Sequence, residues 1–314
     1  MASHPTTASA ARPPSGGPRP AVPAVPAAGR PGGVSPDATG TAGDMTDVTD
    51  VTGTAGAAGA PPATVPGSAV RASRRAMRAR AAIVTERGTG GRTVLATMRS
   101  DPPLTLRVTA PGQVHLVSTA AGPLGGDDLA LDIEVAPGTA VEVRSVASTL
   151  VLPGSAGGES LMTVTARVGA GASLRFAPEP TVLAAGCRHR MVVRLDLAED
   201  ARVFWREEIV FGRYGERPGR CHSRFDAVSG GVPLLRQEFV VGDPEIDGSP
   251  AVYGDAGCVG STLVTGRAPR TVVGDGWAAL PLAGPATLVS ALGRDAVELR
   301  RRLRQGEEAA AARP

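Results

Sequence analysis

Three stretches of this chain repeat one pattern: Val135-Ala-Pro-Gly-Thr-Ala-Val141-Glu-Val143, Val168-Gly-Ala-Gly-Ala-Ser-Leu174-Arg-Phe176 and Leu197-Ala-Glu-Asp-Ala-Arg-Val203-Phe-Trp205. Each is the end of a strand, a four-residue turn and the start of another strand. The turn residue returns after 33 and then 29 residues, as Gly138, Gly171 and Asp200. A unit this small cannot bury its own apolar face, so neighbouring units must stack. The pattern predicts a mainly all-β fold, a β-helical, solenoid-like stack of short strands.

The residues around these turns alternate with a period of two. Leu129, Leu131 and Ile133, for example, are separated by less apolar side chains, as in a half-buried strand. Because periodicity identifies strands better than their connections, an ordinary sandwich of meandering strands is the alternative. Residues Ala286–Arg304 have apolar side chains near helical spacing and an arginine-rich last turn. They predict a C-terminal helix, one of one or two helices in all.

The composition excludes several classes of protein. The combined count of lysine and arginine is 33, and all 33 are arginine. The chain therefore has no Schiff-base lysine and no phosphate-loop lysine. Against 30 acidic residues the net charge is only +3, which gives little support to a nucleic-acid partner. Three cysteines, an odd number, argue against a disulfide framework and suit a reducing compartment. We therefore expect a cytoplasmic protein.

The two ends of the chain are expected to lie outside the folded domain. Ala, Pro and Gly fill 39 of the first 70 positions, and this predicts a disordered leader over residues 1–70. Residues 71–80 hold five arginines, which we interpret as a linker or first strand edge, with a basic patch for a partner as the alternative. No apolar export or membrane segment follows them. The β-helical domain is predicted over residues 71–306, with a frayed tail over 307–314.

Cysteine and histidine come close together at two places. Cys187 and His189 are two residues apart and can share one face of a strand, whereas Cys221 and His222 are adjacent and point to opposite faces. Two ligands do not close a structural zinc site, which needs four nitrogen or sulfur ligands. Ordinary thiols and histidines are therefore expected, with a weak soft-metal contact as the alternative.

Two carboxylates have unusual surroundings. Asp127 directly follows the turn Gly122-Pro-Leu-Gly125-Gly126, which allows its side chain to reach neighbouring backbone or a passing ion. Glu207 is in phase with Trp205 and Ile209, so it shares their apolar face and is costly to bury unless it is paired, hydrogen-bonded or wet. An internal salt bridge to Arg213 or Arg224 is the alternative.

Several motifs occur in a specific order along the chain. They are Gly91-Arg92-Thr93-Val94-Leu95, Gly122-Pro-Leu-Gly125-Gly126-Asp127, Ala147-Ser148-Thr149, Ala177-Pro-Glu179-Pro-Thr181, Trp205 through Gly212-Arg213, and Pro233-Leu234-Leu235 with Glu238. In this order and spacing the chain resembles the urease accessory protein UreD family, called UreH in some organisms. The resemblance covers about Arg78 to Gly242, and no convincing match is found from Asp243 onward.

The resemblance implies a β-helical scaffold without enzymatic activity that serves in nickel insertion into the urease apoprotein. It implies three partners: UreF, the GTPase UreG recruited through UreF, and the urease apoprotein. It also implies no tightly bound cofactor, since Ni²⁺ would only pass along an internal wet tunnel.

Carried over by position, the resemblance assigns the tunnel lining to Asp127 and Glu207, with Thr149, Glu179 and Glu238 as further candidates. Oxygen ligands and water suit the passage of a hydrated divalent cation, because weak contacts at several sites let the ion leave again. Two other functions are kept open. One is a hydrolase that uses Asp127 and Glu207 as an acid and base pair, and the other is a non-catalytic β-solenoid interaction module.

Overall fold

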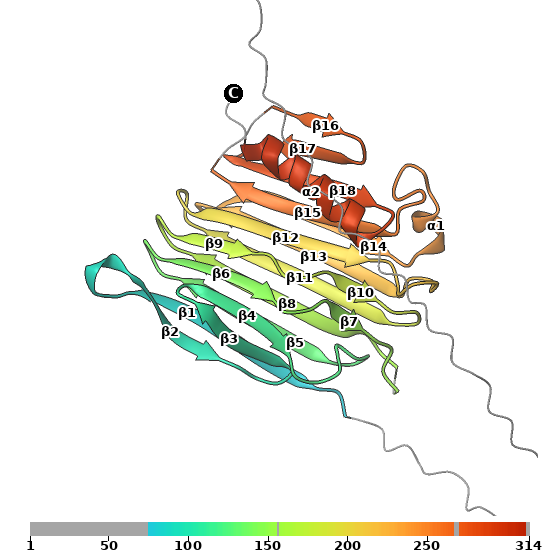
Figure 1. Ribbon diagram of the computed structural model, residues 1–314, viewed down its shortest axis with the longest axis horizontal. Coiled ribbons are helices and arrows are strands. Elements are labelled where there is room, and N and C mark those ends of the chain that lie inside the picture. Colours follow the sequence, from blue (N-terminus) through green and yellow to red (C-terminus); the bar gives the residue numbers. More distant parts are fainter. Residues whose placement is uncertain (1–74, 156, 267–269, 312–314) are drawn as a thin grey trace, which may run out of the picture. The chain divides into compact units, whose positions relative to one another are not determined.

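The computed structural model describes residues 75–155, 157–266 and 270–311. The predicted leader over residues 1–70 lies outside this part of the chain. The described residues form two sheets that enclose a common core, and a C-terminal helix lies on the outer face of one sheet (Figure 1).

The seven-stranded sheet is called sheet A. In spatial order it contains β14 (Val232–Val241), β13 (Arg220–Ser229), β11 (Arg188–Leu197), β8 (Ser160–Val168), β5 (Asp128–Val135), β1 (Arg78–Arg87) and β2 (Thr93–Arg99). A 3-10 turn, η1 (Thr89–Gly91), connects β1 and β2.

The eleven-stranded sheet is called sheet B. Its main path contains β16 (Val272–Gly274), β17 (Trp277–Pro281), β18 (Ala286–Gly293), β15 (Cys258–Thr265), β12 (Arg202–Val210), β9 (Ser173–Phe176), β6 (Ala140–Ser145), β4 (Gln113–Ser118) and β3 (Leu104–Ala110). Beside this path lie the short strands β10 (Thr181–Leu183) and β7 (Thr149–Val151).

The central strands wind as a solenoid. The chain passes from β5 in sheet A to β6 in sheet B, adds β7, returns as β8, and follows the same route through β9, β10 and β11 (Figure 1). Each return pairs in parallel with the previous turn: Leu129 lies beside Met162, and Met162 beside Met191. This parallel pairing confirms the predicted β-solenoid, of about four turns, and not a meandering sandwich.

The repeated turns stack on one another as the sequence pattern predicts. The backbone N–H of Gly138 donates to the carbonyl of Ala170 at 2.9 Å, and that of Gly171 donates to Oδ1 of Asp200 at 3.0 Å. Both glycines have positive φ, 67° and 62°, a backbone conformation that side-chain-bearing residues seldom adopt. The spacings of 33 and 29 residues are therefore each the length of one turn of the solenoid.

The main core lies between the inward faces of the two sheets. Before Phe176 it is built from valine, leucine, isoleucine and alanine, with no aromatic side chain. At Phe176 the composition changes, because its ring stacks on Trp205 with the centroids 4.0 Å apart, and Phe225 meets Trp205 edge-on at 6.1 Å. Such aromatic contacts add about 0.5–1.5 kcal/mol each beyond the area they bury.

The C-terminal region differs from the prediction. Residues 286–293 form strand β18, and the helix α2 (Ala296–Ala311) begins ten residues later than predicted. Both faces of β18 are covered, by the solenoid core and by α2, so its apolar run lacks the alternation that identifies a half-buried strand. Asp295 caps the helix, since its Oδ1 accepts from the N–H groups of Val297 and Glu298.

The helix also extends beyond the predicted boundary at Gly306. Gly306 lies inside α2, where a Cβ atom would come within 2.3 Å of the Val289 side chain, so glycine permits the helix to approach the sheet. Residues 307–311 continue the helix, and Glu307 is ion-paired to Arg206. The prediction that the tail frays from residue 307 is therefore wrong for residues 307–311.

A second helix, α1 (Pro244–Asp247), is four residues long and follows β14. Two α-helices thus accompany the strands in the part of the chain that the structure describes, in agreement with the prediction. Among the described residues, no helix has the length and apolar character needed to span a membrane.

Candidate functional site

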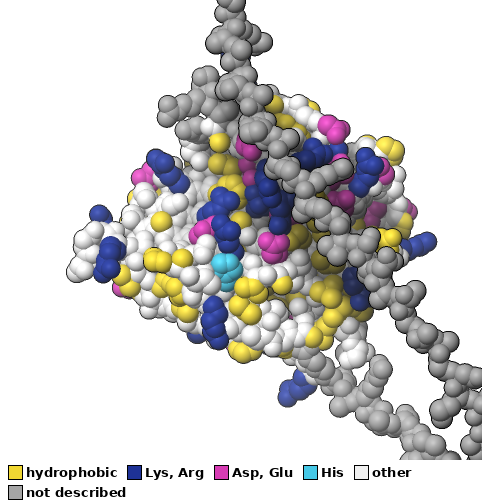
Figure 2. Space-filling model, viewed as in Figure 1, with side chains coloured by type: hydrophobic (Ala, Val, Ile, Leu, Met, Phe, Trp, Pro, Cys, Tyr) yellow, Lys and Arg dark blue, Asp and Glu magenta, His cyan; other side chains and the backbone are white. Residues whose placement is uncertain are grey.

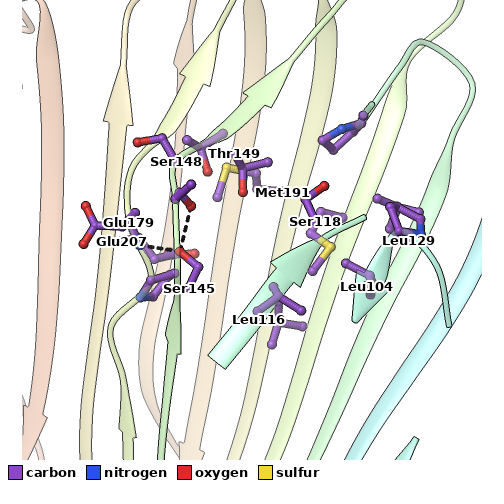
Figure 3. A pocket seen from close by; sticks show the side chains of 18 of the residues that line it. Leu104, Leu116, Ser118, Leu129, Ser145, Ser148, Thr149, Glu179, Met191 and Glu207 are labelled. Carbon is purple, nitrogen blue, oxygen red and sulfur yellow. Dashed lines mark hydrogen bonds between the residues drawn. The ribbon is translucent and has the colours of Figure 1, made fainter. Parts of the chain in front are cut away.

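A cavity of about 160 Å³ lies inside the solenoid, at the end where β7 and β10 join the turns. It is lined by the starts of β5, β8 and β11 from sheet A and by the ends of β4, β6 and β12 from sheet B (Figure 3). Leu104, Leu116 and Leu129 form part of an apolar wall. Facing them are hydroxyl, carboxyl, imidazole and thioether groups, of Ser118, Ser145, Ser148, Thr149, Thr181, Glu179, Glu207, Glu208, His189, Met162 and Met191.

Glu207 lies on the cavity wall, on the face of β12 that the alternation predicts. Its neighbours two residues away, Trp205 and Ile209, are 1% exposed core residues. Glu207 forms no ion pair with any described residue, and the two predicted alternatives have other partners: Arg213 pairs with Glu216, and Arg224 with Asp226. The carboxyl group thus faces the cavity, half-buried and without a compensating cation.

This environment changes the acidity of Glu207. Burial raises the pKa of its carboxyl from 4.5 to about 7, although the nearby Trp205 side chain partly opposes the shift. The indole Nε1 of Trp205 is buried and has no hydrogen-bond partner of normal geometry among the described residues. The cavity wall is mainly apolar, and Glu207 is one of the few polar groups on it, so the space beside this carboxyl is large enough for water to solvate it.

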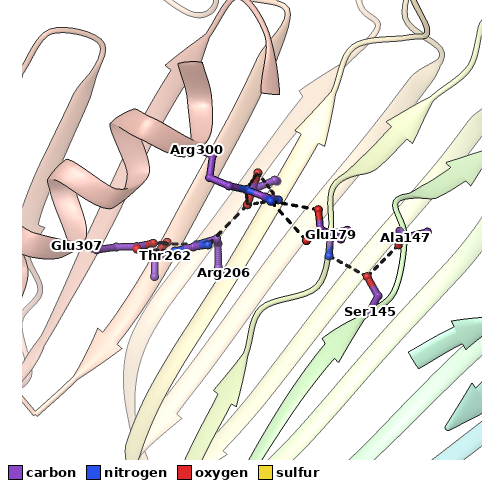
Figure 4. A network of polar contacts seen from close by, with 8 residues as sticks. Ser145, Ala147, Glu179, Arg206, Thr262, Arg300 and Glu307 are labelled. Carbon is purple, nitrogen blue, oxygen red and sulfur yellow. Dashed lines mark hydrogen bonds and ion pairs between the residues drawn. The ribbon is translucent and has the colours of Figure 1, made fainter. Parts of the chain in front are cut away.

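Glu179 and Glu208 stand at the side of the cavity nearest α2, and one arginine bridges them (Figure 4). The guanidinium of Arg300 lies 3.0 Å from a Glu208 carboxylate oxygen and 3.1 Å from one of Glu179. The side chain of Glu208 is fully buried, and burial raises its pKa while Arg300 opposes the rise. Helix α2 therefore supplies the cation that makes this buried carboxylate tolerable.

A second ion pair, next to the one made by Arg300, also attaches α2 to sheet B. Nε of Arg206 donates to Glu307 at 2.9 Å, and the hydroxyl of Thr262 donates to the same carboxylate at 2.7 Å. The carboxylate of Glu307 thus holds the helix to β12 and β15, next to the bridge made by Arg300 (Figure 4).

Asp127 does not line the cavity. It is 2% exposed, and its carboxylate accepts from the backbone N–H of Met77 at 2.8 Å and of Leu124 at 2.9 Å. The expectation that it reaches neighbouring backbone is confirmed. Asp127 holds the turn whose residues Gly122 and Pro123 form part of the cavity wall.

Thr149 and Glu179 lie on the cavity wall with Glu207. Thr149 begins β7 and pairs with Thr181 of β10, so both hydroxyl-bearing residues come from adjacent turns. The backbone N–H of Glu179 donates to the hydroxyl of Ser145 at 2.8 Å, and that hydroxyl donates to the carbonyl of Ala147 at 2.9 Å. This chain of contacts positions Glu179 toward Arg300 (Figure 4).

Glu238 lies elsewhere. It projects from the outer face of β14, where its side chain is 49% exposed and forms ion pairs with His222 and Arg224. The structure therefore gathers Thr149, Glu179 and Glu207 around one cavity, leaves Asp127 behind its wall, and separates Glu238 from it.

The cysteine and histidine pairs are mostly buried. His189 lines the cavity, and burial lowers the pKa of its imidazole from 6.5 to about 4, although Ser160, whose hydroxyl oxygen lies 2.8 Å from Nδ1, opposes this shift. Cys187 and Cys221 are free, buried thiols, and burial raises the pKa of Cys187 to about 11. No three His, Cys, Asp or Glu side chains of the described residues group closely enough to hold a metal ion.

Sequence reasoning missed three groups at this site. Met191 could have been found, because it shares the inward phase of β11 with His189, which the sequence had already singled out. Glu208 and Arg300 could not, since Glu208 is out of phase with Glu207 and its partner lies 92 residues further along the chain.

The parallel strands define the class of protein: a β-solenoid with an internal, mainly apolar cavity, in which the predicted acid and base carboxylates do not face one another. The family model of the UreD urease accessory protein matches residues 77–314, and this chain belongs to that family. Accessory proteins of this family are not enzymes, in agreement with the prediction.

Relatives in the same family agree with this assignment. The chain is 44% identical to the urease accessory protein UreD of Frankia casuarinae, over 76% of this chain and 91% of the relative. Identity to the UreD protein of Frankia alni is also 44%, over 74% of this chain and 93% of the relative. Identity to the UreD protein of Streptomyces avermitilis is 40%, over 68% of this chain and 90% of the relative. The family match reaches residue 314, so the interpretation that no resemblance extends beyond Asp243 is wrong.

Proposed function

We propose that this protein is a maturation factor for urease that supports insertion of Ni²⁺ into the urease apoprotein. The proposal rests on membership of the UreD urease accessory family and on the cavity in the solenoid. The observation that carries the nickel part is the Glu207 carboxyl, which has no ion pair with a described residue and lines the same cavity as Thr149 and Glu179. Oxygen donors spread along a wall bind a divalent cation weakly enough for it to move on.

Within this proposal Ni²⁺ is cargo and no cofactor is held permanently. Glu207, with a pKa near 7, changes charge easily at neutral pH, so it can pair with an arriving cation and accept a proton when the cation leaves. Arg300 pairs with the carboxylates of both Glu179 and Glu208, so one guanidinium serves two acids, and an arriving cation can compete with it for them.

The partners that we propose are UreF, the GTPase UreG recruited through UreF, and the urease apoprotein. No membrane or nucleic-acid partner is included in the proposal. The cytoplasm is the proposed location, and the three free, buried cysteines suit a reducing compartment.

The two alternative functions are less well supported. A hydrolase needs Asp127 and Glu207 to face one substrate, but both carboxylate oxygens of Asp127 accept from backbone N–H groups behind the cavity wall. A plain interaction module gives no reason to enclose an unpaired glutamate, which costs free energy.

The test is Glu207→Gln in cells that produce the urease subunits and all accessory proteins. We expect the nickel content and activity of purified urease to fall several-fold, while co-purification of the variant with UreF and urease is retained. Glu134→Gln, on the exposed face of β5, is the matched control because it removes one carboxylate outside the cavity. If urease from cells with Glu207→Gln contained as much nickel as urease from cells with the unaltered protein, the nickel path would be refuted. If the unaltered protein itself did not co-purify with UreF and urease, the scaffold role would be refuted.

A further inference from the structure

The outer face of sheet B is only partly covered. Helix α2 packs over β15, β17 and β18, whereas the outward side chains of β4, β6 and β9 are half-buried or exposed. Figure 2 shows this side of the molecule, where arginine side chains gather between the helix and the N-terminal strands.

The outward basic side chains of these strands lie in successive rows across the sheet. Arg107 of β3 lies beside His115 of β4, which lies beside Arg144 of β6. Arg175 of β9 lies beside Phe204 of β12, with Arg202 two residues earlier on the same face. We call Arg107, Arg144, Arg175 and Arg202 the arginine stripe. The arginine stripe thus crosses sheet B from β3 to β12, over neighbouring strands that are about 4.8 Å apart.

The positive charge of the stripe is not balanced. On the outer faces of β3, β4, β6 and β9, which the structure describes in full, Glu142 is the one acidic side chain. Glu142 is shared by Arg144 at 2.6 Å and Arg175 at 3.2 Å. Arg107 and Arg202 form no ion pair with any described residue. Two of the four guanidinium groups of the stripe thus share one carboxylate, and the other two have none among the described residues.

Arg175, near the middle of the stripe, is held in place before any ligand arrives. The guanidinium of Arg175 lies 3.8 Å from the centre of the Phe204 ring. The guanidinium of Arg206, which is ion-paired to Glu307, lies 5.3 Å from the centre of the same ring. Burial lowers the pKa of Arg175, and the charge of Arg206 acts in the same direction. A fixed, crowded guanidinium loses little entropy when it binds an anion, and an added carboxylate relieves the crowding.

We propose that the arginine stripe binds an acidic, extended segment of a partner protein, with carboxylates held by Arg107, Arg144, Arg175 and Arg202. Guanidinium groups bind carboxylates with paired hydrogen bonds, and the excess of cations on this face calls for an anionic occupant. A nucleic acid is less well matched, because a net charge of only +3 on the whole chain gives no extended positive field. The inference uses neither the cavity nor the nickel path.

The full chain can be tested with a fluorescein-labelled (Asp-Gly)4 peptide, by fluorescence anisotropy at low salt. Arg107→Gln/Arg202→Gln removes two guanidinium groups that have no ion pair, so the fold should be preserved. Arg188→Gln/Arg194→Gln on the outer face of β11 is the control with the same change in charge. We expect the first double variant to weaken binding at least fivefold and the control to change it less than twofold, with unaltered melting temperatures.

Three results would overturn the proposal. They are equal losses in the two double variants, equal binding of an (Asn-Gly)4 peptide, and tighter binding of a single-stranded DNA octamer that depends on the same arginines. The last result would replace the acidic protein segment by a nucleic acid as the occupant.

Discussion

Trp205 and Glu207 lie two residues apart on the same inward face of β12, yet their surroundings are opposite. Trp205 is 1% exposed and stacks on Phe176 in the main core. Glu207 faces the cavity, with the hydroxyl of Thr149 and the imidazole of His189 on the same wall. One strand thus belongs to a packed core along part of its length and to the wall of a cavity along the rest.

The difference shows how the solenoid separates stability from function. In the packed part, both sheets contribute apolar side chains in register, so van der Waals contacts are complete. In the cavity, β7 and β10 are only three residues long, and loop residues replace sheet strands on the wall. We therefore expect substitutions in the packed part to lower the free energy of unfolding and those in the cavity to act on nickel delivery.

The largest expected effect is that of Trp205→Ala. Removing the ring leaves a hole beside Phe176 and Phe225, and such substitutions typically lower the free energy of unfolding by about 3–5 kcal/mol. Urea denaturation followed by circular dichroism measures this. Trp205→Phe, which keeps most of the packing, should lose less, and a loss under about 1 kcal/mol for the alanine variant would contradict the distinction between the two parts.

Arg300→Gln should give the next largest effect. It leaves the buried Glu208 carboxylate with only Arg206, whose nearest nitrogen is 3.9 Å away. Removing one partner of a fully buried pair costs about 3–5 kcal/mol, and about 2–3 kcal/mol is expected here because Arg300 is partly exposed. The double variant Glu208→Gln/Arg300→Gln should recover most of the loss in the same denaturation experiment. A double variant less stable than Arg300→Gln would show that Glu208 does not need its cation.

Glu207→Gln should change how stability depends on pH. The folded state holds the Glu207 proton more tightly than the unfolded state, because its pKa is raised from 4.5 to about 7. The unaltered protein therefore loses stability as the pH rises through this interval, by at most about 3 kcal/mol, and the variant lacks this loss.

Thermal unfolding at several pH values from 4.5 to 8 measures that difference. His189, whose pKa is lowered to about 4, acts in the opposite sense, since its contribution is lost as the pH falls from 6.5. It is present in both proteins, so subtracting the two curves isolates Glu207. Parallel curves would mean that the Glu207 carboxyl is not enclosed.

The smallest effect is expected for Glu238→Gln. This carboxylate is half exposed in its ion pairs with His222 and Arg224, and exposed pairs contribute about 0–1 kcal/mol. We also expect no change in the nickel content of urease in producing cells. A loss of nickel as large as that for Glu207→Gln would show that the outer face of β14 takes part in delivery.

Much of the fold could be predicted from the sequence because the solenoid repeats a local pattern. The turn residues Gly138, Gly171 and Asp200 fixed the length of each turn, and alternation placed Glu207 on the inward face. The strand over residues 286–293 was missed, because a strand covered on both faces has no period of two.

The candidate site was predicted less completely. Thr149, Glu179 and Glu207 do meet at the cavity, while Asp127 is used by the backbone and Glu238 faces outward. A shift of one position along a strand moves a side chain to the other face, so a family resemblance read to within one residue cannot fix the side.

The sequence by itself determined the period of the solenoid, the class of its strands and the side on which Glu207 lies, because these depend on spacing along a single strand. Only the tertiary structure decided that Glu207 meets a cavity while Trp205 meets Phe176, and that Arg300 neutralises Glu208 from 92 residues away. A cavity and a long-range ion pair are made by segments that meet only when the chain closes upon itself, so no local pattern encodes them.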